Sequence, residues 1–144
     1  MIAVHPGTGT RLSMDLALVL DAPLAVQVHL ATVLPAFAIG TWLIFFSTKG
    51  AWLHRRMGAI YLALMTVTAV ATIFIRSVNP GRLSVIHLFI PLTLFGVFGA
   101  LWHVRRRNIA GHRNAMIGLY VGGLLIAGSL TFLPGRLMHR LFFG

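Results

Sequence analysis

Apolar residues fill most of the chain, in four long runs that short polar or basic segments separate. Each run is about 20 residues long, which is the length that an α-helix needs to cross the hydrocarbon core of a bilayer. Inside a bilayer every backbone N–H and C=O must find a partner within the protein, so unbroken apolar runs predict helices and not a barrel. The pattern therefore predicts an all-α, polytopic membrane protein with four transmembrane helices. These are expected at roughly Pro23 to Phe46, Trp52 to Ile75, Leu83 to Val104 and Ala110 to Leu133.

The segment before the first run lacks the features of a cleaved signal peptide. Residues 1–22 carry Asp15 and Asp21 in their apolar part and have no Lys at their start. We interpret them as an extramembranous leader, followed by a single four-helix domain over residues 23–144. Asp21 stands just before Pro23, an arrangement typical of a helix N-terminus, so we expect it to cap the first helix.

The composition agrees with a membrane protein and excludes several kinds of catalytic site. The 144 residues are 58% hydrophobic, and the mean hydropathy is +0.88. The two acidic residues, Asp15 and Asp21, both precede the first run, and the chain has no Cys. Carboxylate-pair hydrolysis, carboxylate proton relays across the membrane and thiolate chemistry therefore have no residues on which to operate.

Basic residues are concentrated in two of the three connections between the runs. The net charge is +10, but these residues flank apolar runs, so lipid headgroups and not nucleic acid are the expected partners. An excess of Lys and Arg marks the cytoplasmic side of a membrane protein, which places both connections inside and both termini outside. The residues concerned are Lys49, Arg55, Arg56, Arg105, Arg106, Arg107 and Arg113.

The two halves of the chain resemble each other. His29 and His54 are 25 residues apart, as are His87 and His112. We interpret this spacing as two parallel helical-hairpin repeats, residues 23–80 and 81–137, which together form an up-down-up-down bundle. With one inserted residue, the same offset also aligns Met57 with Met116 and Tyr61 with Tyr120.

The four histidines that the repeats share are expected at two depths. His29 and His87 lie a few residues into runs that start outside, whereas His54 and His112 open the runs that start in the cytoplasm. In an up-down-up-down bundle the first and third helices are diagonal, as are the second and fourth, so each diagonal carries two imidazoles at one height. Two facing imidazoles suit the two axial positions of a haem iron. These four residues are therefore the candidate cofactor-binding and metal-ligating set.

Helical periodicity places small and polar residues on the same sides as two of these histidines. Such residues suit close helix packing or leave room for a cofactor. The Gly118-x-x-x-Gly122 pattern is expected to be a helix-packing motif. The face of His29 includes Thr32, Ala36, Gly40 and Ser47, and the face of His54 includes Gly58, Tyr61, Met65, Thr68 and Thr72.

Other interpretations of these histidines stay open. A lone histidine at a membrane interface is usually only an interfacial polar group, which is the expected role of His5, His103 and His139. His103 stands at the end of the third run and is an alternative ligand to His112. Histidine together with methionine at membrane depth also suits copper. In a scaffold or assembly subunit, the histidines would instead bond across helices and bind no cofactor.

Several motifs resemble a family of bacterial membrane proteins. The stretches "VHL", "TKGAWLHRRMGAIY", "LSVIHL" and "GHRNAMIGLY", with "PGR", are similar to domain of unknown function 2306, over about residues 25–137. This resemblance implies a four-helix fold in the bacterial plasma membrane and no established activity. The histidine layout also resembles transmembrane b-type cytochromes, such as the ascorbate-dependent ones, whose four-helix core holds two haems. Carried over, that layout implies an outer haem between His29 and His87 and an inner haem between His54 and His112.

The sequence thus leads to one working hypothesis and two alternatives. The hypothesis is an integral membrane protein that binds haem b through paired histidines and carries electrons across the plasma membrane. The alternatives are a non-catalytic membrane scaffold and a copper-handling membrane protein. The sequence indicates no catalytic residue, redox partner or oligomeric state.

Overall fold

A computed structural model describes residues 17–75 and 85–134, and all regular structure in these ranges is helical. Four helices are long and apolar enough to cross a membrane, which confirms the four expected spans. A single helical turn at residues 17–20 precedes them. The helices are α2 (Leu24–Phe45), α3 (Trp52–Phe74), α4 (Val85–Arg105) and a fourth made of α5 (Ile109–Gly118), η1 (Leu119–Ile126) and α6 (Ala127–Leu130).

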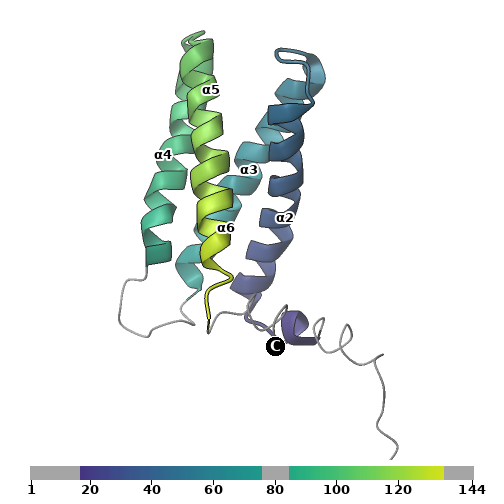
Figure 1. The fold of residues 1–144 in the computed structure, drawn as a ribbon, viewed down its shortest axis with the longest axis vertical. Coiled ribbons are helices and arrows are strands. Elements are labelled where there is room, and N and C mark those ends of the chain that lie inside the picture. Colours follow the sequence, from purple (N-terminus) through teal and green to yellow (C-terminus); the bar gives the residue numbers. More distant parts are fainter. Residues whose placement is uncertain (1–16, 76–84, 135–144) are drawn as a thin grey trace, which may run out of the picture.

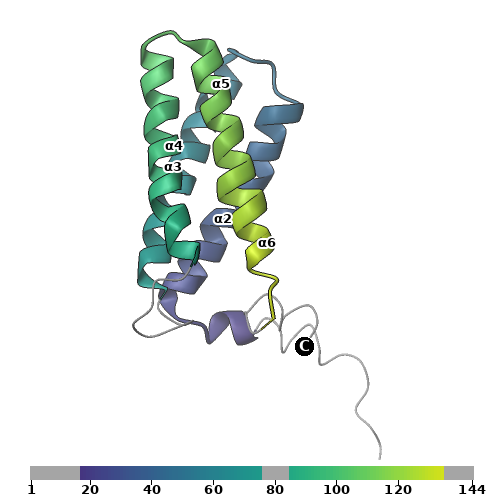
Figure 2. The same ribbon diagram turned by 60° about the vertical axis from the view of Figure 1, so that its left-hand side comes forward.

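The four helices lie side by side in both views of the bundle (Figures 1 and 2). The short connections at 46–51 and 106–108 lie at the same end, drawn at the top of Figure 1. Helix α2 packs on α3 and on η1, while α4 packs on α3, α5 and η1. Each helix therefore has two main neighbours, and α2 lies across the bundle from α4.

The start of α2 is not capped as the sequence predicts. The N-cap position is Pro23, and no side chain caps the helix, so the expected role of Asp21 is wrong. Instead, the Gln27 side chain donates hydrogen bonds backwards, to the carbonyl of Leu20 at 2.8 Å and to that of Ala22 at 2.9 Å. These bonds tie the chain that enters the membrane to the first turns of α2.

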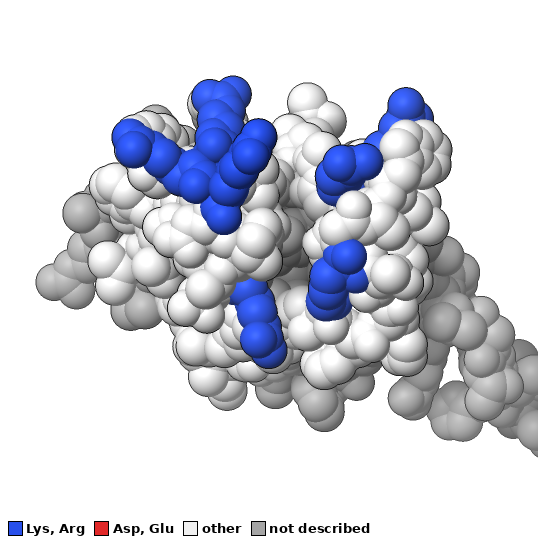
Figure 3. Space-filling view, turned by 90° about the horizontal axis from the view of Figure 1, so that it is seen from above, with Lys and Arg blue, Asp and Glu red and all other residues white. Residues whose placement is uncertain are grey.

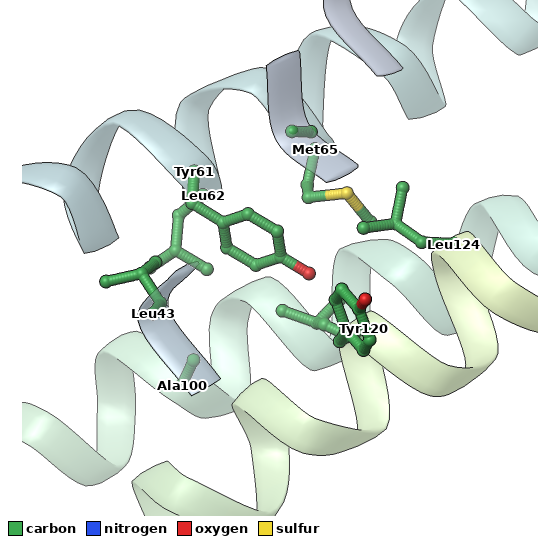
Figure 4. Close-up of a cluster of buried hydrophobic side chains, with 9 residues drawn as sticks. Leu43, Tyr61, Leu62, Met65, Ala100, Tyr120 and Leu124 are labelled. Carbon is green, nitrogen blue, oxygen red and sulfur yellow. The ribbon is translucent and has the colours of Figure 1, made fainter. Parts of the chain in front are cut away.

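Two tyrosines meet in the core of the bundle. Tyr61 from α3 and Tyr120 from η1 lie near each other in the core (Figure 4), and both rings lie against Gly40 of α2. A Cβ at position 40 would lie 2.8 Å from a ring carbon of Tyr61 and 2.9 Å from one of Tyr120, so only glycine admits both rings. The Tyr120 hydroxyl shares a 2.8 Å hydrogen bond with Thr41. The two tyrosines that the sequence analysis aligns are thus brought together at one small residue.

The outward faces of the bundle are apolar. Leu24, Leu88 and Phe95 expose 74%, 70% and 75% of their surface. In water such a surface would mark an interaction site, but around four membrane-length helices it is the surface that lipid tails cover.

The fourth helix contains a π-helical segment that the sequence does not predict. In η1 the backbone hydrogen bonds depart from the α-helical pattern, in which each N–H bonds to the carbonyl four residues earlier. The N–H of Ala127 instead reaches the carbonyl of Gly122, five residues earlier. Gly122 and Gly123 lie inside this segment, where glycine eases unusual backbone geometry. The expected packing role of Gly118 is wrong, because a Cβ there would meet nothing within 4 Å.

Candidate functional site

The four candidate histidines lie two at each end of the bundle. His29 is near the start of α2 and His87 near the start of α4, at the lower end in Figure 1. His54 and His112 lie in the first turns of α3 and α5, at the end that carries the two short connections. All four are half-buried.

His29 links α2 to α3. Its Nδ1 lies 3.0 Å from the Thr72 hydroxyl and 3.4 Å from the Thr68 carbonyl oxygen. The Thr72 hydroxyl donates its own hydrogen to that carbonyl, at 2.8 Å. Since a hydroxyl has one hydrogen, Thr72 must accept from His29, and we infer that His29 carries its proton on Nδ1. A 2.7 Å hydrogen bond between the hydroxyls of Thr32 and Thr68 joins the same two helices.

His54 is held by the end of α2. Its Nδ1 lies 2.7 Å from the Ser47 hydroxyl, which donates its hydrogen to the Leu43 carbonyl at 2.7 Å. By the same reasoning Ser47 accepts from His54, whose proton is on Nδ1. The Lys49 ammonium folds back on the carbonyls of Leu43 and Ile44, which satisfies the last turn of α2 beside the histidine.

His112 is held by α4. Its Nδ1 lies 3.0 Å from the carbonyl oxygen of Ala100, which can only accept, so the proton is again on Nδ1. Local structure fixes the start of α5: Arg107 turns the chain with a φ of 56°, and the Asn108 side chain accepts a 2.9 Å hydrogen bond from the N–H of Gly111. This tight turn brings the first turn of α5 back against α4.

Three of the four histidines are therefore held in one tautomer. A neutral imidazole with its proton on Nδ1 keeps a lone pair on Nε2. When a neighbouring oxygen fixes one ring nitrogen in this way, the other nitrogen is the one that binds metal. No hydrogen bond to the Nε2 of His29, His54 or His112 is formed within residues 17–75 and 85–134.

His87 and His103 differ from these three. The Nδ1 of His87 is buried and has no hydrogen-bond partner in the described part of the chain. The Nδ1 of His103 lies 3.3 Å from the Asn108 amide nitrogen, in the turn between α4 and α5. His5 and His139 lie outside the described residues.

Two of the four candidate histidines lie near each other across the bundle. His54 and His112 lie within electrostatic reach of each other. Over the two described ranges, however, there is no group of three or more His, Cys, Asp and Glu residues placed to hold a metal ion. In the described part of the chain the arrangement thus brings His54 and His112 near each other and forms no cluster of ligands.

Protein side chains fill the interior between the two histidine levels. Tyr61 and Met65 are completely buried there, and Tyr120 and Leu124 pack against them (Figure 4). Two cavities, of about 440 and 310 Å³, lie along α4, and neither is lined by a histidine. A flat macrocycle between facing histidines would therefore need the two hairpins to separate at that level.

The end of the bundle where α3 and α5 begin is strongly basic, and Lys and Arg side chains gather over it on both hairpins (Figure 3). Arg56 lies 4.4 Å from the centre of the Trp52 ring, and Arg106 lies 4.6 Å from that of Trp102. Tryptophan and arginine together are typical of the membrane–water interface. Asp21, the acidic residue within the described ranges, lies at the opposite end.

A comparison with known proteins fits this picture. Residues 26–142 match the family described as "Predicted membrane protein (DUF2306)". The chain belongs to this family. The match includes the last three spans of this DUF2306 protein, the first span from residue 26 onward and all four candidate histidines, and the family description names no activity. No curated protein and no solved structure matches the chain.

The sequence locates the histidines of this DUF2306 chain but not the oxygens that hold them. Periodicity places Ser47 on the face of His29, whereas it bonds to His54, because the chain turns back after Phe46. Thr72 falls on the face of His54 but bonds to His29 on the neighbouring helix. The depth of Thr72 in the membrane could have indicated its contact with His29, because the two residues lie at the same height once α2 and α3 form a hairpin.

Proposed function

We propose that the protein binds haem b through His29, His87, His54 and His112 and carries electrons across the bacterial plasma membrane. The proposal includes an up-down-up-down bundle of two parallel hairpin repeats, with both termini outside the cytoplasm. The observation that carries it is the oxygen that lies at the Nδ1 of His29, His54 and His112, from which we infer one shared tautomer with a lone pair on Nε2.

Pairs of imidazoles favour haem over a bare metal ion. A metal ion held by protein side chains alone commonly takes three or four ligands at one point, and no group of three or more His, Cys, Asp and Glu side chains occurs among the residues described. Haem brings four equatorial nitrogens of its own and needs only one or two axial ligands from the protein. When bound, it would supply one-electron exchange at its iron.

In this proposal each residue has a defined role. His54 and His112 would hold the inner haem, and His29 and His87 the outer one. Ser47 and the Ala100 carbonyl would keep the inner imidazoles turned with Nε2 toward the iron. The basic residues at the same end suit the negative charges of haem propionates.

The absorption spectrum of protein purified from cells supplied with haem tests the proposal. We expect a Soret band and reduced-form bands typical of b-type haem, which His54→Ala with His112→Ala diminishes. His103→Ala is the matched control, because His103 lies at the same end and bonds only within its turn. Absence of a Soret band, or a band that survives alanine at all four histidines, would end the haem proposal.

A structural scaffold is the second candidate, supported by a different observation. The bond between His29 and Thr72 joins two helices, and Tyr61 and Met65 fill the core between the two histidine levels. If the histidines act only as interhelical bonds, alanine at His29 lowers the stability of the bundle in detergent and removes no cofactor. A colourless protein with that response would favour the scaffold.

A further inference from the structure

A cavity of about 310 Å³ lies between α4 and the fourth helix, near the middle of both spans. Its size is within the range of sites that hold small organic ligands. Its wall contains three glycines, Gly96, Gly118 and Gly123, and one polar side chain, Thr93. No charged residue lines it. The cavity therefore suits an uncharged molecule.

Thr93 differs from the other threonines of the bundle. Its residue surface is only 7% exposed, yet its hydroxyl forms no hydrogen bond in the described part of the chain. Thr41, Thr66 and Thr72 each donate to the carbonyl four residues earlier, as threonines in helices commonly do. The hydroxyl is accessible from the cavity, which offers it no protein partner, and a ligand oxygen there would satisfy it.

The wall opposite Thr93 is formed by the start of the π-helical segment. Leu119 and Gly123 belong both to η1 and to the cavity. π-Helical segments are rare in proteins, and those that occur often lie at functional sites. A Cβ at Gly96 or Gly123 would collide with Leu119 or Met65, whereas a Cβ at Gly118 would meet nothing within 4 Å. Of these three glycines in the lining, Gly118 is therefore the one where a side chain can be added without a clash.

The cavity opens toward lipid. Phe95 and Leu92 stand on its rim and are 75% and 55% exposed, on the outward face of α4. A ligand would enter sideways from the bilayer and not from either aqueous phase, so it must be soluble in lipid.

We propose that this cavity binds a lipid-soluble carbonyl compound of the quinone class. The Thr93 hydroxyl donates to the carbonyl oxygen, the glycine wall admits a flat ring, and the apolar rim holds a hydrocarbon tail. We choose a quinone among carbonyl compounds because of the proposed electron-carrying function. The existence of the binding site does not depend on that function.

Binding of a decyl-substituted benzoquinone to the purified protein, followed by quenching of tryptophan fluorescence, tests this site. Gly118→Leu places a side chain in the cavity without a clash, so we expect binding to weaken about tenfold or more. Gly128→Leu is the matched control, since Gly128 also faces open space on the fourth helix but does not line the cavity. It should bind as the unchanged protein does.

The Thr93 hydroxyl has its own test. Thr93→Val keeps the shape and removes one hydrogen bond, so we expect affinity to fall about fivefold. Thr66→Val, whose hydroxyl bonds only within α3, should leave affinity unchanged.

Two results would overturn the site. One is equal quinone affinity in Gly118→Leu and Gly128→Leu. The other is a decylbenzene that competes as well as the quinone, which would make the cavity an ordinary lipid contact. The assay does not require haem. A colourless protein that binds the quinone with the expected variant pattern would refute the electron carrier and retain the site.

Discussion

Oxygen atoms beside Nδ1 fix the orientation of three histidines. The Ser47 hydroxyl, the Thr72 hydroxyl and the Ala100 carbonyl all meet an Nδ1 atom, although they come from different parts of the bundle. In metal sites such partners select the tautomer and strengthen the ligand. Loss of one partner should therefore weaken ligation without removing the ligand.

Ser47→Ala tests this role at the inner pair. Without the serine the His54 ring loses its fixed tautomer and orientation, so we expect haem affinity at this site to fall about 10- to 100-fold. The measurement is a Soret titration of the haem-free protein. Ser129→Ala is the control, because the Ser129 hydroxyl bonds only to its own helix. Equal affinities in the two variants would contradict the role of Ser47.

Gly40→Ala tests the meeting of the two tyrosines. The added methyl would lie under 3 Å from both rings, so the rings or the helices must move. We expect a loss of about 1–3 kcal/mol in the free energy of unfolding, measured by denaturation in detergent. Gly58→Ala, where a Cβ meets nothing within 4 Å, should not destabilise the protein. Equal stability of the two variants would show that the core tolerates the methyl.

At the scale of helices, the sequence predicts well that four membrane-spanning helices exist and how long they are. Hydropathy alone locates four spans within a few residues of the helices, because burial in lipid dominates the energetics of such segments. It misses the π-helical segment Leu119–Ile126, since a shift of hydrogen bonds by one residue leaves the apolar pattern unchanged. The sequence places Gly40 among the residues suited to close packing, as the structure has it, but it also expects packing at Gly118, where a Cβ would meet nothing within 4 Å.

The candidate site is only half predictable for a related reason. Spacing predicts which histidines would pair, because an equal interval between residues can be read from the sequence alone. Their partners depend on the register of neighbouring helices, which no local pattern encodes. Thr72 reaches His29 only because α2 and α3 pack with their ends level.

A double-mutant cycle tests the packing of α2 against α3. Thr32→Val and Thr68→Val each remove one side of a 2.7 Å hydroxyl–hydroxyl bond between these helices. We expect a coupling of about 0.6 kcal/mol in unfolding free energy, the average for such bonds in membranes. Thr32→Val combined with Thr66→Val should show none, since Thr66 bonds within its own helix. Equal coupling in the two cycles would contradict the register of the hairpin.

At the scale of the whole molecule, charge and apolar surface define an orientation. The basic end, with Arg56 and Arg106 over tryptophans, should face the cytoplasm. Because the chain has no Cys, single cysteines report sidedness without background. In intact cells, a membrane-impermeant maleimide should label Asp21→Cys and not Thr48→Cys. Both positions are exposed and lie at opposite ends. The reverse pattern would invert the proposed topology and exchange the inner and outer pairs.

The haem content of the purified protein tests the paired-histidine proposal most directly. Quantified as pyridine haemochrome per chain, it should be two in the unchanged protein. It should fall to one in His54→Ala with His112→Ala and to one in His29→Ala with His87→Ala, while His103→Ala keeps both. A haem-free protein from haem-replete cells, or a content that is the same in all of these variants, would contradict the proposal.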